Sequence, residues 1–349
     1  MCSSPPSVTV CLPNLNNRKF LNERLDTILN QTYKDWELVV VDGYSDDGAW
    51  ELIQEYAAGE PRMRICQAPR EGIYEAINAC LRLARGKYVY IATSDDTMVP
   101  GCLHQMVAAL NAHPECGLAH CRLQVLDLAG NVVTAPSLEN SPVSQYLNGL
   151  SDVSHIRYAP HDGLLHVMGY TVYTSLTQLL IRHSLIEKIG LFRSSWGSIG
   201  DFEWGMRAGL VTNTIYIPEA LASWRVHEHQ ATASVDFYSE HHLMTVLAMM
   251  REAIKKAREI GDPSLGNLSQ RHLETLMERR LLLSKLGSQK GPSKKLIALW
   301  KYLWRRPDVF WAFVGYRLLG LGKGRMKPHE WAKSELARYL PQPWHRIVE

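Results

Sequence analysis

Short apolar runs alternate with stretches of helical periodicity along the first 112 residues of the chain. The runs that predict strands are rich in β-formers and lie at Val8–Leu12, Glu37–Val41, Met63–Cys66 and Lys87–Ala92. Apolar residues recur at the spacing of one helix face in Phe20–Gln31, Asp47–Ala57, Ile73–Arg85 and Pro100–Ala112. We expect Gly86 to end the third helix as its C-terminal cap. Alternating elements of this size predict an α/β fold with a mainly parallel sheet flanked by helices.

The pattern changes beyond residue 112. The run from Gly117 to Val133 predicts a strand pair that turns at residues 129–131, and residues of about 135–175 lack periodicity and predict a long loop region. Further helices are expected near Arg182–Ile189 and Asp201–Gly209, and further strands at Asn213–Ile217 and Ala222–Val226. From about residue 239 the pattern is almost wholly helical. We therefore expect two parts, an α/β domain over residues 1–240 and a helical region over 241–349.

The distribution of charge supports this division. The 349 residues are 46% apolar and 21% charged, which is ordinary for a folded protein. Residues 1–240 contain 17 Lys and Arg against 26 Asp and Glu, whereas residues 241–349 contain 21 against 9. The first part suits the binding of a cation, and the second suits an anionic partner.

Cysteine usage and the N-terminus both bear on the cellular compartment. The chain has seven cysteines without a CxxC pair, which predicts buried or free thiols in a reducing compartment. The N-terminal residues lack the pattern of a signal peptide. The longest apolar stretch, Val309–Leu321, is interrupted by Arg317 and is too short to span a bilayer. We expect a cytoplasmic protein.

Polar and acidic residues follow three of the predicted strands. The first strand leads into Pro13-Asn14, the second into Asp42, and the fourth into Ser94-Asp95-Asp96. Ligands of open parallel sheets bind beyond the carboxyl ends of the strands. Asp95 and Asp96 repel each other and gain most from a cation between them. A single Asp after a strand can equally be a helix cap or a turn residue, and this alternative stays open for Asp42.

Four ordered motifs resemble a known family. They are VTVCLPNLNN, VVVDGYSDDGAWELI, REGIYEAINACLRLARGKYVYIATSDDT and GDFEWGMRAG. Together they resemble the family-two glycosyltransferases of the GT-A fold over roughly residues 7–230, of the type that builds bacterial surface polysaccharides. The resemblance implies a Rossmann-like sheet and an inverting transfer. The sugar would pass from a nucleotide-sugar donor, UDP-sugar favoured, to a hydroxyl of a glycan or lipid-linked acceptor.

The resemblance also implies how the donor is held. It assigns Asp42 to the nucleobase, with Pro13 and Asn14 beside it, and it places Ser94, Asp95 and Asp96 at a DxD-type motif that binds donor ribose and a divalent metal. Which of Asp95 and Asp96 is the main metal ligand stays open, as does the choice between Mn²⁺ and Mg²⁺. Thr93 stands where the commoner motif has its first Asp. Arg70 is expected to contact the phosphate or the nucleobase of the donor. The alternative is that Arg70 is a solvated surface residue.

The remaining site residues follow from the later motifs. The resemblance places the general base at Asp201, whose alternative is a helix N-cap after Gly200, with Glu203 as the fallback base. It places His227 at the metal or the diphosphate, and Arg225 is a candidate diphosphate partner. For the acceptor we expect contacts from the region of about 135–200, and the candidates there and beyond it are Trp196, Glu203 and Trp204.

The C-terminal region mixes cations with aromatic residues. Five of the ten tryptophans lie there, at positions 300, 304, 311, 331 and 344. This composition suits a helix in the headgroup region of an anionic membrane. Packing onto the first part and formation of a homodimer are the alternatives, and no other feature indicates nucleic-acid binding.

Two other functions remain as alternatives. A catalytically silent module that binds a nucleotide-sugar or a membrane surface would bind its ligand without turnover. A sugar nucleotidylyltransferase would need a Gly-rich basic loop near the first strand, and CLPNLNNRKF lacks one. The donor sugar, the acceptor and the oligomeric state do not follow from the sequence.

Overall fold

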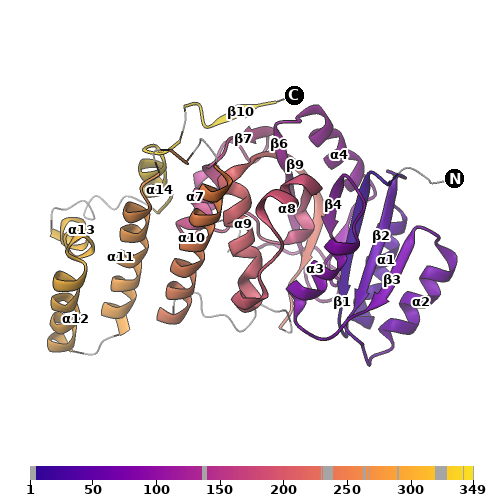
Figure 1. The fold of residues 1–349 in the computed structure, drawn as a ribbon, viewed down its shortest axis with the longest axis horizontal. Coiled ribbons are helices and arrows are strands. Elements are labelled where there is room, and N and C mark those ends of the chain that lie inside the picture. Colours follow the sequence, from indigo (N-terminus) through magenta and orange to yellow (C-terminus); the bar gives the residue numbers. More distant parts are fainter. Residues whose placement is uncertain are drawn as a thin grey trace.

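The computed structural model describes residues 5–135, 140–228, 230, 239–261, 265–266, 268–288, 291–318, 328–340 and 342–348. Within these ranges the strands form one ten-stranded mixed sheet, with helices on both faces (Figure 1). The strand order is β10-β7-β9-β6-β8-β4-β1-β2-β3, and β5 pairs with β9 off this path. The α/β fold is confirmed, although the sheet is parallel only in part.

The first four strands are parallel, as predicted. They are β1 (Val8–Asn14), β2 (Trp36–Asp42), β3 (Met63–Gln67) and β4 (Tyr88–Ile91). The helices of this half are α1 (Arg18–Leu29), α2 (Ala49–Gly59), α3 (Ile73–Leu83) and α4 (Cys102–Ala112).

Alternate residues of β1 enter different layers of the core. Val10 and Leu12 pack in one cluster with residues of α1, α2 and α4, whereas Cys11 packs in the other with Ile77 of α3. Every residue of β1 and β2 is buried. Because helices cover both faces, these strands are continuous apolar runs in the sequence.

The second half of the sheet departs from the predictions. β9 (Asn213–Arg225) is one bent strand instead of two, because its pairing with β6 (Cys116–Leu126) shifts register between Ile217 and Ala220. β8 (Leu179–Arg182) runs antiparallel between β4 and β6, and β5 (Thr97–Met98) pairs antiparallel with β9. The two predicted helices are α8 (His183–Ile189) and α9 (Gly200–Val211), and the 3₁₀ segments η1 (Leu176–Gln178) and η2 (Ser194–Ile199) precede β8 and α9.

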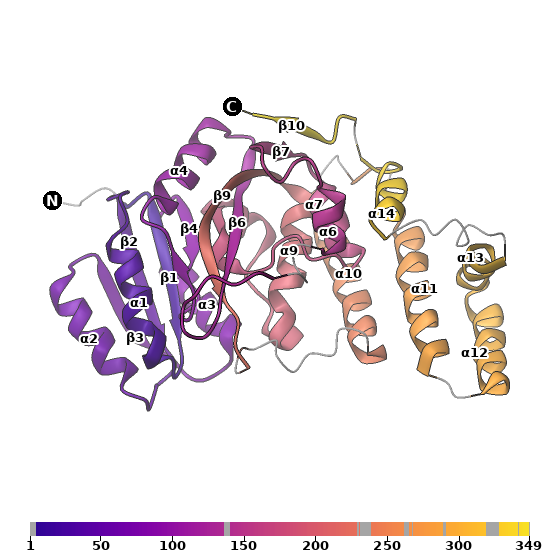
Figure 2. The same ribbon diagram turned by 180° about the vertical axis from the view of Figure 1, so that it is seen from behind.

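The predicted loop of residues 135–175 contains regular structure. It holds α6 (Pro142–Tyr146), β7 (His155–Arg157) and α7 (His161–Val167), which lie together in Figure 2. The core under these elements is partly polar, because Arg157 makes a fully buried ion pair with Asp162 at 2.7 Å. Buried polar residues remove the apolar periodicity that would have predicted the elements.

The C-terminal helices begin inside the same core and extend away from it. They are α10 (Glu240–Ile260), α11 (Gln270–Ser288), α12 (Pro292–Arg305), α13 (Pro307–Leu318) and α14 (Pro328–Leu336). Met249 and Met250 of α10 are fully buried in the cluster that includes Trp204 of α9. The chain then returns to the sheet as β10 (His345–Ile347), which pairs with β7 (Figures 1 and 2). A domain boundary at residue 240 stays a prediction, but the two parts share one core.

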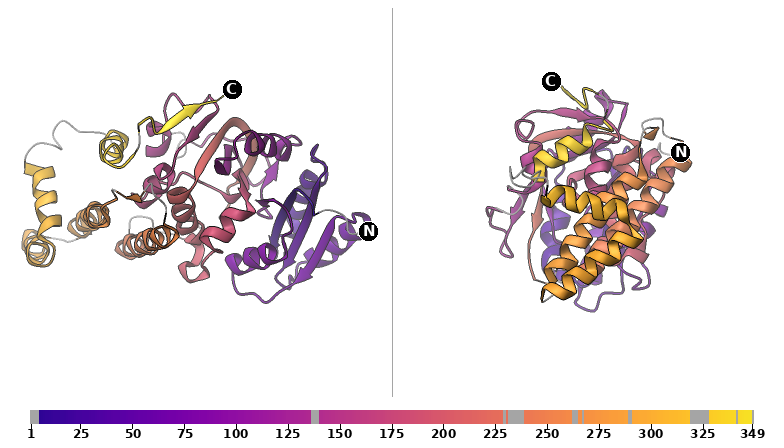
Figure 3. Two further views of the ribbon diagram at one scale, coloured as in Figure 1. Left: turned by 45° about the horizontal axis from the view of Figure 1, so that its top comes forward. Right: turned by 90° about the vertical axis from the view of Figure 1, so that its left-hand side faces the viewer.

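The far end of the helical region lies away from the sheet. α12 and α13 are the elements farthest from β1–β3, and the right-hand view of Figure 3 shows the helical layer in front of the sheet. Among the helices that the structure describes, none is both long and apolar enough to cross a bilayer. The six cysteines in the described ranges are free.

Gly86 has a role other than the predicted helix cap. α3 ends at Leu83, with Ala84 as its C-cap residue. A Cβ atom on Gly86 would lie 2.5 Å from the Thr9 backbone nitrogen and 2.8 Å from the carbonyl carbon of Val8. Glycine is therefore required here because the chain entering β4 passes close to the backbone of β1.

We predict that Gly86→Ala lowers the free energy of unfolding by about 1–3 kcal/mol, because backbone atoms of β1 would have to move. Gly59→Ala is the matched control, since a Cβ atom there meets nothing within 4 Å. Its effect should stay within about 1 kcal/mol. Urea unfolding of both variants measures the difference, and equal stabilities would contradict this role of Gly86.

Candidate active site

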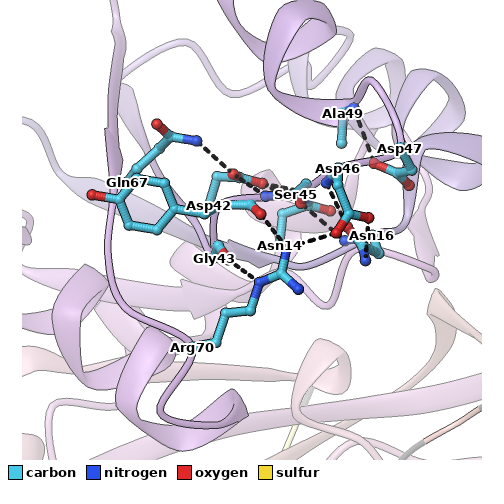
Figure 4. Close-up of polar contacts among 11 residues, drawn as sticks. Asn14, Asn16, Asp42, Gly43, Ser45, Asp46, Asp47, Ala49, Gln67 and Arg70 are labelled. Atoms are coloured by element: carbon cyan, nitrogen blue, oxygen red, sulfur yellow. Dashed lines mark hydrogen bonds and ion pairs between the residues drawn. The ribbon is translucent and has the colours of Figure 1, made fainter.

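The carboxyl ends of β1 and β2 hold a buried carboxylate. Asn14 and Asp42 are register partners, and the Asn14 amide donates to Asp42 Oδ1 at 2.8 Å (Figure 4). Ser45 donates to the same carboxylate through its backbone N–H at 2.9 Å and its hydroxyl at 2.6 Å, and Gln67 donates at 3.1 Å. Burial alone would raise the pKa of Asp42, but these hydrogen bonds outweigh it and lower the pKa below its ordinary value. Asp42 is thus a fixed anion beside Pro13 and Asn14.

Two further features of this corner suit a ligand. The Asn14 Oδ1 atom is buried and accepts no hydrogen bond from the described residues. Arg70 reaches over the loop after β2, where its Nε donates to the Gly43 carbonyl at 2.9 Å and its guanidinium pairs with Asp46 at 3.0 Å (Figure 4). The side chain of Arg70 is 46% exposed. The predicted nucleobase and Arg70 positions therefore adjoin each other at the sheet edge.

The second acidic cluster follows β4. The β5–β9 pairing brings Asp96 to the end of β9, where Asp96 Oδ1 accepts the Arg225 backbone N–H at 2.9 Å. Asp96 Oδ2 accepts the hydroxyls of Thr93 and, at 3.2 Å, Ser175. Burial and the neighbouring charge of Asp95 raise the pKa of Asp96 to about 7. Both oxygens of Asp96 are thus engaged by the protein.

Asp95 faces the other way and meets His227. Its Oδ2 lies 3.0 Å from His227 Nε2, and its side chain is 23% exposed. The Arg225 guanidinium lies beneath this pair, because its Nε donates to the Asp95 carbonyl at 2.8 Å and its Nη2 donates to Glu23 at 2.6 Å. Arg225 is buried among protein acceptors, and its predicted contact with a diphosphate stays a prediction.

The asparagines after β1 connect the two clusters. Asn16 donates its amide to Asp46 at 3.0 Å and its backbone N–H to the Ser45 hydroxyl at 2.9 Å. Asn17 donates to the Ser94 hydroxyl at 2.8 Å. This single loop therefore holds the Asp42 corner and the Ser94-Asp95-Asp96 corner side by side.

The residues present fit a divalent cation. No group of three or more potential ligands is preassembled among the described residues. Asp95 and His227 nevertheless lie together at one partly exposed point. The carboxylate oxygen suits Mn²⁺ or Mg²⁺, whose coordination phosphate oxygens would complete, and the imidazole nitrogen is a further ligand for a transition metal. The buried and fully bonded Asp96 shapes the loop that presents Asp95.

Asp201 lies in the wall of a cavity. It is in the first turn of α9, which begins at Gly200, so that Ile199 and not Asp201 is the N-cap residue. Its Oδ1 accepts the Tyr74 hydroxyl at 2.9 Å and the Phe202 N–H at 2.8 Å. Burial raises the pKa of Asp201 above its ordinary value, and the Tyr74 hydrogen bond acts in the opposite direction. A carboxylate of this kind suits proton abstraction.

The cavity has a volume of about 950 Å³ and is lined by Asp201. Its walls also include Trp224 and Thr174. Trp224 and Thr174 directly precede Arg225 and Ser175, the two residues that donate to Asp96 from outside its own loop. Further polar and aromatic lining residues are His120, Arg122, Asp152, His155, Tyr170, Tyr173, Phe202, Tyr216 and His242.

The structure corrects two acceptor predictions. Glu203 is fully buried and forms a bidentate pair with Arg207 at 2.8 and 2.9 Å. Trp204 is fully buried as well, and its ring stacks on Phe192 at 5.0 Å. Neither side chain is accessible to an acceptor. Trp196 is partly buried against the core, and its role stays a prediction.

Several contributors to the site were not predicted. Ser45, Gln67 and Ser175 satisfy the two buried carboxylates, and Tyr74 contacts Asp201. Ser45 lies within the VVVDGYSDDG motif, three residues after Asp42, where a side chain commonly bonds back to a preceding Asp. Ser175 and Gln67 carry no comparable signal.

Part of the chain is similar to a family of known proteins. Residues 9–135 match the family model described as "Glycosyl transferase family 2". Over these residues the chain is similar to this family. EpsE of Bacillus subtilis (strain 168) is 32% identical over 130 residues, which are 37% of this chain and 47% of EpsE. Chondroitin synthase of Escherichia coli is 28% identical over 129 residues, which are 37% of this chain and 19% of that protein. The match thus spans less than half of either family relative.

Solved structures show the same GT-A fold over most of the chain. S. aureus TarS 1-349 in complex with UDP-GlcNAc superposes with a TM-score of 0.58 at 15% identity, covering 95% of this chain and 89% of TarS 1-349. The mannosyltransferase PcManGT from Pyrobaculum calidifontis, in complex with GDP-Man and Mn²⁺, gives a TM-score of 0.50 at 19% identity and covers 89% of this chain and 85% of its own. The similarity of fold therefore extends well beyond residue 135.

We predict that Glu203→Gln acts on stability. The variant leaves the buried Arg207 without its carboxylate, which should lower the free energy of unfolding by about 3–5 kcal/mol in urea titrations. Glu115→Gln removes the exposed pair with Arg346 at 2.9 Å and is the control, with an expected change of about 1 kcal/mol or less. A fully stable Glu203→Gln variant would contradict a structural role for this residue.

Proposed function

We propose that the protein is an inverting glycosyltransferase that moves a sugar from a nucleotide-sugar to a hydroxyl of a glycan or a lipid-linked glycan. The observation that carries the proposal is the position of Asp201. Its carboxylate lines a cavity that is also lined by Thr174 and Trp224, the chain neighbours of Ser175 and Arg225, which both bond Asp96. We therefore place the acceptor sugar in this cavity, between the proposed base and the proposed diphosphate-binding corner.

The donor half of the mechanism follows from the two strand-end corners. The unsatisfied Asn14 Oδ1 offers an acceptor to an N–H group of a nucleobase, beside Asp42, which holds the Asn14 amide, and Arg70. Asp95 and His227 would hold the divalent cation, which supplies Lewis-acid stabilisation of the diphosphate leaving group when bound. Ser94, which belongs to the second corner and bonds Asn17 of the connecting loop, suits the ribose. UDP is the favoured nucleotide, supported by the UDP-GlcNAc complex of TarS.

The acceptor half depends on Asp201. Its carboxylate takes the proton of the acceptor hydroxyl while the oxygen attacks the anomeric carbon from the face opposite the leaving group. One displacement of this kind inverts the anomeric centre. The cavity combines Tyr170, Tyr216 and Trp224 with hydrogen-bonding side chains, which suits a sugar with both apolar and hydroxyl faces.

The test is donor turnover by the whole chain. We expect slow release of nucleotide from one member of a panel of UDP-, GDP- and dTDP-sugars, dependent on Mn²⁺ or Mg²⁺. Asp201→Asn and Asp95→Asn should each lower the rate at least about 100-fold, because they remove the base and a metal ligand. Asp26→Asn is the control, since Asp26 bonds Tyr56 at an exposed position away from the site.

The alternatives give different results in the same assay. Metal-dependent binding of one donor in calorimetry, with no turnover even when glycan acceptors are added, would indicate the catalytically silent binding module. Formation of a nucleotide-sugar from a nucleoside triphosphate and a sugar phosphate would indicate a nucleotidylyltransferase. Neither binding nor turnover of any donor would overturn the transferase proposal.

We also propose that α12 lies on an anionic membrane surface, where a lipid-linked acceptor would be found. Leu296, Ile297, Trp300 and Trp304 share one face of α12 and are 56–71% exposed. By helical spacing, Lys294, Lys301 and Arg305 lie next to this apolar face on one side of it. α12 contains no acidic residue. A bare apolar stripe edged by cations suits the headgroup region.

The other C-terminal tryptophans divide between the alternatives. Trp344 supports packing, since its ring stacks on His161 at 4.3 Å. Trp311 is 62% exposed on α13. The side chain of Trp331 lies outside the described residues. Packing onto the first part therefore accounts for Trp344, and the exposed face of α12 is left for a membrane or a second copy of the chain.

We predict that the protein sediments with vesicles of phosphatidylcholine and phosphatidylglycerol and less with phosphatidylcholine alone. Trp300→Ala/Trp304→Ala should weaken this binding at least about tenfold, because the apolar stripe is lost. Leu128→Ala/Val132→Ala is the control, since these apolar residues are similarly exposed (56% and 62%) but belong to the segment after β6 and not to α12. Unchanged vesicle binding, or a shift from dimer to monomer in the tryptophan variant, would contradict membrane docking.

A further inference from the structure

We propose that Tyr74 is a positioning residue that fixes the Asp201 carboxylate and leaves its Oδ2 as the atom that accepts the proton. This inference rests on the proposed role of Asp201 as the base. The Tyr74 hydroxyl lies 2.9 Å from Asp201 Oδ1, across 127 residues of sequence, and 3.1 Å from the Ser198 carbonyl oxygen. The contact joins the start of α3 to the start of α9.

The two oxygens of Asp201 have different surroundings. Oδ1 accepts both the Tyr74 hydroxyl and the Phe202 backbone N–H, at 2.9 and 2.8 Å. No hydrogen bond to Oδ2 is formed by the residues that the structure describes. Because Asp201 lines the cavity, the oxygen without a protein donor is the one available to an acceptor hydroxyl.

Stacked aromatic rings hold Tyr74 in place. The Tyr74 ring is 5% exposed and stacks on Phe192 at 5.8 Å, with 9° between the ring planes. Phe192 stacks on the buried Trp204 at 5.0 Å. The side chain of Asn78 binds both backbone groups of Phe192, at 2.8 and 3.0 Å. The Tyr74 hydroxyl therefore has little freedom to leave Asp201.

Gly200 makes the close approach possible. A Cβ atom at this position would lie 2.8 Å from Tyr74 Cε2 and 3.0 Å from the Arg193 carbonyl oxygen. Any larger residue before Asp201 would push the Tyr74 ring away from the carboxylate.

The other charged groups around α9 are engaged elsewhere. Glu203 of α9 pairs with Arg207, and Arg193 pairs with Glu203 and with Glu252 of α10 at 3.3 and 3.6 Å. From α7, the His166 ring packs on Phe202 at 5.0 Å. His242 of α10 lines the cavity. Tyr74 is the side chain that bonds Asp201 directly among the described residues.

The direction of the expected pH effect follows from this geometry. The Tyr74 hydrogen bond favours the ionised form of Asp201, so its loss raises the pKa of Asp201 further. A base works only when ionised. Removal of the hydroxyl therefore moves the acidic limb of the rate profile to higher pH, so that the activity lost at low pH returns at high pH.

The experiment compares Tyr74→Phe with the wild type and with Tyr56→Phe. Tyr74→Phe removes one oxygen and keeps the ring that stacks on Phe192. Tyr56→Phe is the matched control, because it removes a Tyr–Asp hydrogen bond of 2.8 Å at an exposed site. The first readout is the carboxyl ¹³C shift of Asp201 against pH in selectively labelled protein, assigned by its absence in Asp201→Asn. The second is kcat/KM against pH, with the donor that the wild type hydrolyses.

We expect the Asp201 titration to move to higher pH in Tyr74→Phe and to stay in place in Tyr56→Phe. On the acidic limb, Tyr74→Phe should lose roughly ten- to a hundredfold in kcat/KM, with most of the loss recovered at high pH. An unchanged titration with a normal melting temperature would overturn the inference, and so would a pH-independent loss. Full activity of Asp201→Asn would instead overturn the proposed function, while the carboxyl titration would still report on the contact.

Discussion

The site depends on the burial of one carboxylate, that of Asp96. Removing a carboxylate from water costs several kcal/mol unless donors replace the water, and here Thr93, Ser175 and the Arg225 backbone do so. These donors come from the loop after β4, the segment before β8 and the end of β9. The requirement to satisfy Asp96 therefore fixes three distant segments against each other. Asp95, His227 and the cavity wall take their positions from that junction.

The sequence predicts the first 112 residues well because helices cover both faces of the parallel strands. Uniform burial makes a strand a continuous apolar run, and the helices keep one apolar face, so both periods are visible. Apolar periodicity does not predict the elements of residues 135–175, because Arg157, Asp162 and several histidines fill the interior there. Their hydrogen bonds replace apolar burial, and no periodic signal remains. The sequence predicts two strands where the structure has the single strand β9. The reason is local: the register of β9 against β6 shifts at Pro218 and Glu219.

In the candidate site, too, residues placed by the strand order could be predicted from the sequence, whereas contacts between distant segments could not. Asp42 and Asp95 follow buried strands, so topology alone brings them to one edge. The strand order does not decide which of Asp201 and Glu203 is the base, because the two residues are neighbours in one acidic cluster. On a helix, residues two apart point in nearly opposite directions, and here one faces the cavity while the other faces Arg207 inside the core. The contact of Tyr74 with Asp201 spans 127 residues and could not be predicted from spacing.

The family match ends at residue 135, which separates the proposed donor corner from most of the cavity. Residues 9–135 contain Asn14, Asp42 and Asp95, which form the proposed donor corner. Asp201 and most of the cavity lining lie beyond residue 135 and include residues of α10 and α11. A nucleotide presents the same groups whatever sugar it carries, whereas acceptors differ in size and shape. A donor corner built from consecutive parallel strands can therefore stay constant, while a cavity formed between the sheet and added helices can change without disturbing it.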